Sequence, residues 1–258
     1  MATFLFDSIV FGPVKSRRLG TSLGINLLPT SGKICSFNCI YCECGLNEER
    51  KPDRKRLPAA REIDAELRLK LETLMHENNE PDVITFAGNG EPTLHPDFLK
   101  IIKNTISARN AYCPGAKVSV LSNSTRIWNK DVIDALNLVD MNILKLDSAV
   151  EETVKLINDP NGSFNITDCI EQLKVFKGKL IIQTLFCRGE VNGKHFDNTT
   201  ESELTEWIVA LRAINPEYVM IYSISRDTPI NSIKKVSKDE LLEIGKRLAE
   251  NNIAFEIA

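Results

Sequence analysis

The sequence predicts an α/β protein whose parallel strands form a partial, incomplete β/α barrel of about six βα units. From about residue 82 onward, apolar strand-like runs alternate with amphipathic helical segments, an alternation typical of parallel sheets with right-handed crossovers. The apolar runs are continuous, as expected for strands covered on both faces. A length of 258 residues suits one α/β barrel. A doubly wound open sheet would be expected to carry a Gly-x-Gly-x-x-Gly turn after its first strand, and this sequence contains none.

Seven apolar segments are predicted as strands. The first leads into a cysteine-rich loop, and the last lies at the end of the chain. In order, they are Leu23–Leu28, Val83–Ala87, Val118–Leu121, Met141–Leu146, Leu180–Phe186, Val219–Ile224 and Ile253–Ile257.

Helices are predicted where apolar residues recur three and four positions apart, because this spacing puts them on one face. Such stripes are Ile63, Leu67, Leu71, Leu74 and Met75; Phe98, Ile101, Ile102, Thr105 and Ile106; and Leu204, Trp207, Ile208 and Leu211. Ser237 followed by Glu240 predicts a capping box, and Asn165 with Asp168 is a weaker helix start. Cys169 falls on an apolar stripe, which predicts core packing.

No linker, internal repeat or low-complexity segment interrupts the chain. We therefore expect one domain over residues 1–258, with an N-terminal extension (1–22), a core barrel (23–224) and a C-terminal helix and strand (225–258). At 43% hydrophobic residues the chain can bury a full core, and its net charge of −3 does not mark it as a nucleic-acid binder.

The cysteine pattern and the N-terminus indicate a cytoplasmic protein. The chain has seven cysteines, an odd number, and the four outside the stretch 35–42 show no regular spacing, so a secreted disulfide framework is not expected. The N-terminus lacks the basic region of a signal peptide, and no apolar stretch approaches the roughly 20 residues that span a bilayer.

Three cysteines in a short loop are the most informative motif. Cys35, Cys39 and Cys42 are spaced C-x3-C-x2-C, with Tyr41 just before the last. Three thiolates on one loop can hold three corners of a 4Fe–4S cluster and leave the fourth iron open to a small molecule. The alternative is a zinc site completed by Cys44, although structural zinc usually takes paired C-x2-C ligands. Cys44 is otherwise an inert thiol or a catalytic hydrogen-atom donor.

Polar residues follow several of the predicted strands at their C-terminal ends, where the active sites of β/α barrels are built. The loop Gly88-Asn89-Gly90-Glu91-Pro92 follows the second strand, and its glycines would let backbone approach a ligand. Later strands end in Ser122-Asn123 and in Lys145 with Asp147. Because a lone buried ammonium is costly, we expect Lys145 to face the lumen or to pair with Asp147, as a catalytic contact or a structural ion pair.

The cysteine motif, followed one βα unit later by Gly90-Glu91-Pro92, resembles the radical S-adenosylmethionine superfamily, from Leu23 to roughly Ile224. The resemblance implies a TIM-barrel-like fold and one 4Fe–4S cluster on the three cysteines. It also implies that S-adenosyl-L-methionine chelates the open iron, and that its reductive cleavage gives a 5′-deoxyadenosyl radical that removes a hydrogen atom from substrate.

The same resemblance implies a set of cofactor contacts. Tyr41 and Ile224 would flank the adenine. The loop Gly88, Asn89, Gly90 and Glu91 would approach the methionyl amino group, and Ser122 and Asn123 would reach the ribose or carboxylate.

Within the superfamily, the Gly-Glu-Pro-Thr-Leu-His-Pro stretch and the long N-terminal stretch are similar to the branch that includes 4-demethylwyosine synthase, a tRNA-modifying enzyme. Members of that enzyme group carry upstream cysteines for a second cluster, whereas no cysteine precedes Cys35 here.

Substrate contacts are predicted around the mouth of the barrel and in the polar segment Arg188–Thr200, which we interpret as a substrate-facing loop. The candidate residues are Arg17, Arg18, Gln183, Arg188, Asn198 and Arg226. Two basic clusters are either solvated faces or contacts to RNA or another phosphate-bearing substrate. They comprise Lys15, Arg17 and Arg18, and Lys51, Arg54, Lys55, Arg56 and Arg61.

The leading hypothesis is a radical enzyme acting directly on an unidentified substrate, with a flavodoxin or ferredoxin as reductant and no membrane contact. The alternatives are an activase that makes a glycyl radical on a partner protein, tRNA-base modification, and a zinc-bearing scaffold.

Overall fold

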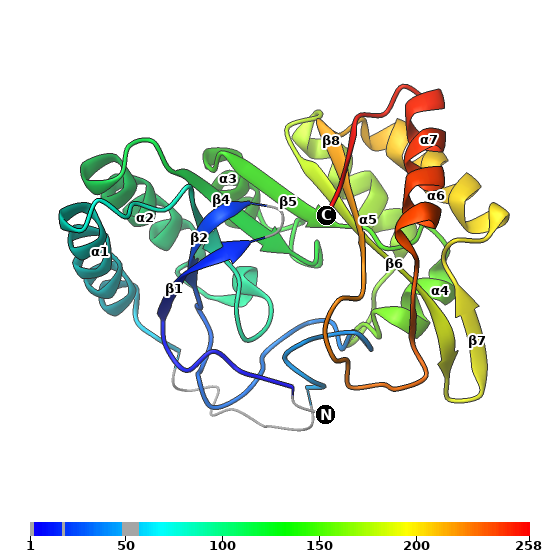
Figure 1. Ribbon diagram of the computed structural model, residues 1–258, viewed down its shortest axis with the longest axis horizontal. Helices are drawn as coiled ribbons and strands as arrows, with labels where there is room; N and C mark the ends of the chain where they lie inside the picture. Colours follow the sequence, from blue (N-terminus) through cyan, green and yellow to red (C-terminus); the bar gives the residue numbers. More distant parts are fainter. Residues whose placement is uncertain (1–2, 17–18, 48–56) are drawn as a thin grey trace.

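The computed structural model describes residues 3–16, 19–47 and 57–258. Its strands form one sheet in the order β1-β2-β3-β4-β5-β6-β8-β10, with β7 and β9 attached to β6 (Figure 1). Neighbours from β2 to β10 are parallel, and β1 is antiparallel to β2. The strands are β1 (Val10–Ser16), β2 (Gly20–Ile25), β3 (Val83–Phe86), β4 (Lys117–Ser122), β5 (Met141–Lys145), β6 (Ile181–Val191), β7 (Lys194–Asp197), β8 (Tyr218–Ser223), β9 (Lys234–Lys235) and β10 (Phe255–Ile257).

The prediction of a partial β/α barrel is confirmed. Each parallel strand from β2 to β8 is followed by one or two helices, which gives six βα units before β10. The helices are α1 (Ala60–His76), α2 (Phe98–Tyr112), α3 (Lys130–Leu138), α4 (Glu151–Ile157), α5 (Ile166–Leu173), α6 (Glu201–Ile214) and α7 (Lys238–Glu250). Among the described strands β1 and β10 are the two edges, so the sheet stays open there.

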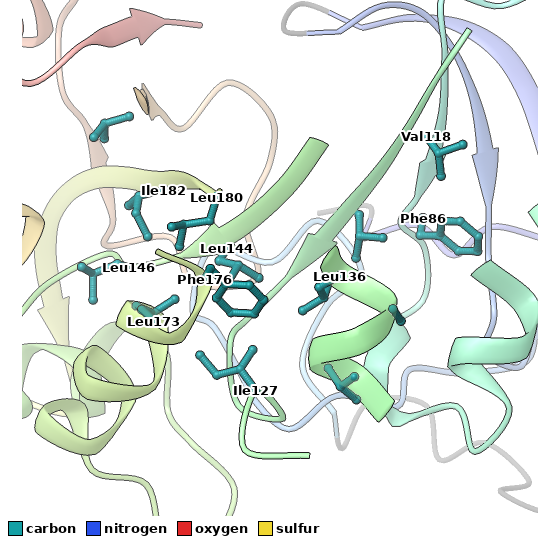
Figure 2. Close-up of a cluster of buried hydrophobic side chains, with 14 of the residues drawn as sticks. Phe86, Val118, Ile127, Leu136, Leu144, Leu146, Leu173, Phe176, Leu180 and Ile182 are labelled. Carbon is teal, nitrogen blue, oxygen red and sulfur yellow. The ribbon is translucent and has the colours of Figure 1, made fainter. Parts of the chain in front are cut away.

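The main hydrophobic core lies between the outward face of the sheet and the helices (Figure 2). Alternate strand residues such as Phe86, Val118 and Leu144 meet the apolar stripes of the helices, which include the predicted stripes of α1, α2 and α6. Cys169 is buried in this core, as predicted. The caps are also confirmed, because Ser237 and Glu240 form a capping box and Asn165 accepts from the backbone N–H of Asp168.

Two sequence-based predictions need correction. The segment Arg188–Thr200 is not a loop, because β6 continues to Val191 and turns back through β7 as a hairpin. The N-terminal extension contributes β1 to the sheet edge, so it is an integral part of the fold. The hairpin has too little apolar content to predict a buried strand, and Gly12 and Pro13 interrupt the short apolar run of β1.

None of the helices in the described part of the chain has the length and apolar character needed to cross a membrane.

Candidate functional site

The loop after β2 and the loop after β3 are joined by backbone hydrogen bonds at the C-terminal end of the sheet. The N–H of Ile34 donates to the carbonyl of Asn89 (2.9 Å), and the N–H of Glu91 donates to the carbonyl of Ile34 (3.0 Å). A Cβ on Gly90 would lie 1.8 Å from the carbonyl oxygen of Ile34, and the φ of Gly90 is +132°. The glycine therefore serves the close approach of the cysteine loop.

Asn89 is fully buried, and its side chain points to the N-terminal segment. Its carboxamide accepts from the N–H of Phe6 (2.8 Å) and donates to the carbonyls of Phe6 (2.8 Å) and Pro29 (3.0 Å). Its own N–H donates to Asn26 Oδ1 (3.0 Å). These bonds use the side chain of Asn89 to fasten three loops together, and its predicted contact with the cofactor stays a prediction.

The predicted metal ligands lie in short turns within this assembly. The N–H of Cys42 donates to the carbonyl of Cys39 (3.1 Å), which folds the loop back on itself. Two side-chain amides approach the sulfurs: Asn123 Nδ2 lies 3.5 Å from Cys35 Sγ, and Asn158 Nδ2 lies 3.5 Å from Cys39 Sγ. Amide donors stabilise negative charge on sulfur, which is the charge a metal-bound thiolate carries.

Lys33 is a buried ammonium beside the cysteines that sequence reasoning missed. Its Nζ donates to the carbonyl of Gly45 (2.8 Å), and its side chain is about 4% exposed. Burial acts to lower the pKa of Lys33, but the thiols of Cys42, Cys35 and Cys39 outweigh it and the pKa is raised. A lysine two positions before a cysteine motif was the available signal.

The thiols differ in acidity because their surroundings differ. Burial raises the pKa of Cys35 to about 12, despite the charge of Lys33, and burial also raises the pKa of Cys39. A hydrogen bond from Cys44, opposed by burial and helped by Lys33, lowers the pKa of Cys42 to about 5. Cys44 is half-buried and its Sγ also contacts the carbonyl of Gly88 (3.4 Å). Its predicted catalytic role stays a prediction.

Glu91 links the loop after β3 to the end of β4. Its Oε1 accepts from the N–H and hydroxyl of Thr93 (3.1 and 2.6 Å) and from the hydroxyl of Ser122 (2.8 Å), and its Oε2 accepts from the N–H of Asn123 (2.7 Å). Burial raises the pKa of Glu91, and these hydrogen bonds offset part of the rise. Glu91, Ser122 and Asn123, predicted from separate motifs, thus form one hydrogen-bonded group.

A second polar group surrounds the end of β5. Tyr41 donates a short hydrogen bond to Asp147 Oδ2, which also accepts from Asn158 Nδ2 (2.7 Å) and lies 3.5 Å from Lys145 Nζ. The ammonium of Lys145 lies 5.1 Å from the centre of the Tyr41 ring. Burial acts to lower the pKa of Lys145, but Asp147 and Tyr222 raise it overall, so the side chain stays an ammonium. The predicted pairing of Lys145 with Asp147 is confirmed.

The donor set is compatible with a cluster. In the part of the chain that the structure describes, no three His, Cys, Asp or Glu side chains converge as ligands of one ion. A cluster spreads its thiolate ligands over separate irons, so it requires no such convergence. Three cysteines on one loop, two amides near their sulfurs and a buried ammonium meet its needs.

The lumen of the sheet holds a cavity of about 310 Å³ whose wall includes residues from β1 to β8. Its lining includes Thr85, Leu121, Ile143, Gln183 and Met220, which come from five successive parallel strands. The Nε2 of Gln183 is buried and has no hydrogen-bond partner in the described structure. Of the predicted substrate residues, Gln183 and Arg226 line this cavity.

The other predicted substrate residues lie elsewhere. Asn198 donates to the carbonyls of Asp147 and Leu185 (both 2.8 Å) and so ties the hairpin to the sheet. Arg188 pairs with Asp197 (3.2 Å) and Glu240 (2.5 Å) in a surface groove beside the hairpin. Ile224 and Tyr41 line the same small recess, and their contact with an adenine stays a prediction.

Several predicted basic contacts fall outside the described residues. These are Arg17 and Arg18 before β2, and Lys51, Arg54, Lys55 and Arg56 after the cysteine loop.

Comparison with protein families identifies the chain. The sequence profile of the Radical SAM superfamily matches residues 30–202, which include the cysteine loop and the strand ends described above. The chain belongs to the radical S-adenosylmethionine superfamily. Iron–sulfur and S-adenosylmethionine binding are the properties of this superfamily.

Several relatives at about 30% identity carry the name UPF0026. One from Helicobacter pylori is 31% identical over 91% of this chain and 72% of its own length, and one from Methanocaldococcus jannaschii is 30% identical over 94% and 70%. A Brachyspira hyodysenteriae protein named GTPase Obg is 33% identical over 96% of this chain. The chain spans only 34% of that protein.

Solved structures share the fold at low identity. A radical SAM methyltransferase from Sphaerobacter thermophilus has a TM-score of 0.67 at 13% identity, covering 92% of this chain and 65% of its own. TYW1 with a lysine–pyruvate adduct bound has a TM-score of 0.61 at 18% identity, covering 90% and 75%.

Proposed function

We propose that this chain holds one 4Fe–4S cluster on Cys35, Cys39 and Cys42, binds S-adenosyl-L-methionine beside it, and removes a hydrogen atom from a substrate in the lumen cavity. When bound, the cluster and cofactor supply a one-electron reductive cleavage of the sulfonium. The protein's own work is to orient the cofactor, keep water out and present the substrate.

One observation carries this proposal. The cysteine loop is joined by backbone hydrogen bonds to the Gly-Asn-Gly-Glu-Pro loop at the C-terminal end of the sheet, and the lumen cavity is lined by Glu43 and Ala87, the residues next to Cys42 and Gly88. Two motifs predicted separately from sequence therefore form one site, at the end where barrel enzymes place their chemistry.

The residues around the site have distinct roles in this proposal. Tyr41 and Ile224 hold the adenine in the recess that they share. Glu91 Oε2 accepts one hydrogen bond in the described structure and keeps a lone pair for the methionyl ammonium. The carbonyls near Gly88 and Gly90 approach the same group, while Asn123 donates to sulfur.

The lumen cavity is the proposed substrate site. Its volume is at the small end of the range for ligand pockets, so it suits a small molecule or a single protruding side chain or base. Gln183 would donate to a substrate oxygen through its unpaired Nε2, and Arg226 would border the entrance. A flavodoxin or ferredoxin is the proposed electron donor.

Anaerobic reconstitution with iron and sulfide tests the proposal. Purified protein should bind about four irons per chain and release 5′-deoxyadenosine from S-adenosylmethionine under dithionite. Cys39→Ala should lose both properties. Cys113→Ala is the matched control, because Cys113 is a buried core thiol far from the loop in sequence, and it should keep both.

Stoichiometric zinc without iron, or full cleavage by Cys39→Ala, would contradict the proposal. A co-purifying large partner with a persistent radical signal would instead favour the glycyl-radical activase. A modified tRNA base after incubation with RNA would favour the tRNA alternative.

A further inference from the structure

Lys33 occupies a position that is costly unless an anion accompanies it. Its ammonium is buried under the cysteine loop, where it donates to the carbonyl of Gly45 (2.8 Å), and the N–H of Gly45 in turn donates to the carbonyl of Cys42 (3.0 Å). Among the described residues, no carboxylate forms an ion pair with it. A buried ammonium with only neutral partners is strongly disfavoured, so the structure calls for negative charge on the neighbouring sulfurs.

The cysteine sulfurs are the candidates for this negative charge. Lys33 stands two residues before Cys35, and Gly45, which accepts from its ammonium, is bonded to the backbone of Cys42, so the ammonium is held within the loop that carries the three cysteines. Lys145 is the second cation near these thiols, but it lies against Asp147 and Tyr41 on the Cys39 side. Lys33 is therefore the cation whose charge is not already balanced by a carboxylate in the described site.

We propose that Lys33 is the positioning residue that sets the reduction potential of the cluster, by placing a fixed positive charge within the loop that carries the cysteine ligands. This inference rests on the proposed function. Reduction adds negative charge to the cluster, so a nearby buried ammonium stabilises the reduced form more than the oxidised form. The charge makes the cluster easier to reduce.

A purely structural role for Lys33 predicts different results. If it acts only as a clip between the loop and the Gly45 carbonyl, any donor at this position should serve. Lys33→Gln retains a hydrogen-bond donor and removes the charge, whereas Lys33→Arg retains the charge. Lys130→Gln is the matched control, because its side chain is 83% exposed and lies on α3.

The test is a redox titration of the reconstituted cluster, followed by electron paramagnetic resonance, with iron content and the thermal unfolding midpoint of each variant. In Lys33→Gln, the ratio of reduced to oxidised cluster at a fixed potential should fall at least tenfold, which equals about 59 mV for one electron. Lys33→Arg and Lys130→Gln should titrate close to the unmodified protein.

The remaining outcomes decide the matter as well. The inference is overturned if the reduction potential of the cluster is unchanged in Lys33→Gln, or if it shifts equally in Lys33→Gln and Lys33→Arg. In both cases the presence of a cluster still supports the proposed function. If Lys33→Gln folds normally but binds no iron, the Lys33→Arg variant decides. Iron binding by Lys33→Arg supports a need for the positive charge, and failure of Lys33→Arg to bind iron overturns the inference. Absence of a cluster from the unmodified protein overturns both proposals.

Discussion

The outward and inward faces of the sheet carry different side chains, although they are built from alternate residues of the same strands. On β3, Ile84 and Phe86 point outward into the helix-covered core, whereas Thr85 lines the lumen. On β6, Ile182 points outward and Gln183 lines the lumen. The outward face is mostly hydrocarbon, interrupted by Thr184 and by Asn142, whose side-chain amide is buried without a partner in the described structure. The inward face also contains unpaired buried polar atoms, including Ser119 Oγ and Gln183 Nε2.

Residues that stabilise the fold and residues that can contact a ligand therefore alternate along the same strand. Packed hydrocarbon stabilises the fold through its burial. An unpaired buried polar atom costs stability, so one that lines a cavity is a candidate for a contact to a ligand. Substitutions on the two faces should therefore have opposite signatures.

The largest expected effect on stability is on the outward face. Phe86→Ala removes a fully buried ring that packs edge-to-face on Phe98, with ring centres 6.3 Å apart, and should lower the free energy of unfolding by about 3–5 kcal/mol. Denaturant unfolding measures this loss. Val175→Ala, at a half-exposed residue, is the control and should change it by less than about 0.5 kcal/mol. A loss below about 1 kcal/mol for Phe86→Ala would remove the basis of the comparison.

The next effect concerns the ion pair at the mouth of the lumen. Asp147→Asn leaves the ammonium of Lys145 without its carboxylate, and both side chains are largely buried, so a loss of about 3 kcal/mol is expected. Asp134→Asn breaks the exposed pair with Lys130 and should cost less than about 0.5 kcal/mol. Equal losses in the two unfolding curves would show that Asp147 does not balance Lys145.

A smaller loss of stability, with a strong effect on the site, is expected at Gly90. Gly90→Ala places a Cβ against the Ile34 carbonyl in a strained backbone conformation, so it should cost about 1–3 kcal/mol and reduce iron incorporation. Gly115→Ala is the control, since its Cβ would meet nothing within 4 Å, and it should be neutral or stabilising by up to about 1 kcal/mol. Full iron incorporation by Gly90→Ala would show that the two loops need no close contact.

The smallest effect is expected in the lumen. Gln183→Leu removes an Nε2 that has no partner in the described structure, so the free energy of unfolding should change by about 1 kcal/mol or less. Ile182→Ala, one residue away on the outward face, should cost about 2–5 kcal/mol. If both variants lose the same stability, Gln183 is a structural residue and the lumen is an ordinary core.

The sequence predicted the elements of the barrel well, because apolar periodicity and capping residues are local properties. It located all seven parallel strands to within a few residues, and it placed Glu91, Ser122 and Asn123 at strand ends. It also predicted the partnership of Lys145 with Asp147, because an ammonium in an apolar strand needs a nearby anion.

It did not predict contacts that depend on how separate loops meet. No sequence pattern indicated that the side chain of Asn89 bonds to Phe6 and Pro29, or that the amide of Asn158 contacts Cys39, Tyr41 and Asp147. Sequence spacing fixes neither the direction of a loop side chain nor its partner 80 or more residues away.

The sequence alone thus determined the superfamily, the parallel strands and the three-cysteine loop, since these depend on spacing and hydrophobic pattern along the chain. Only the tertiary structure decided which side chains surround the sulfurs and that Lys33 is buried beside them. The reason is that burial and charge pairing arise when the ends of strands distant in sequence are brought to the same edge of one sheet.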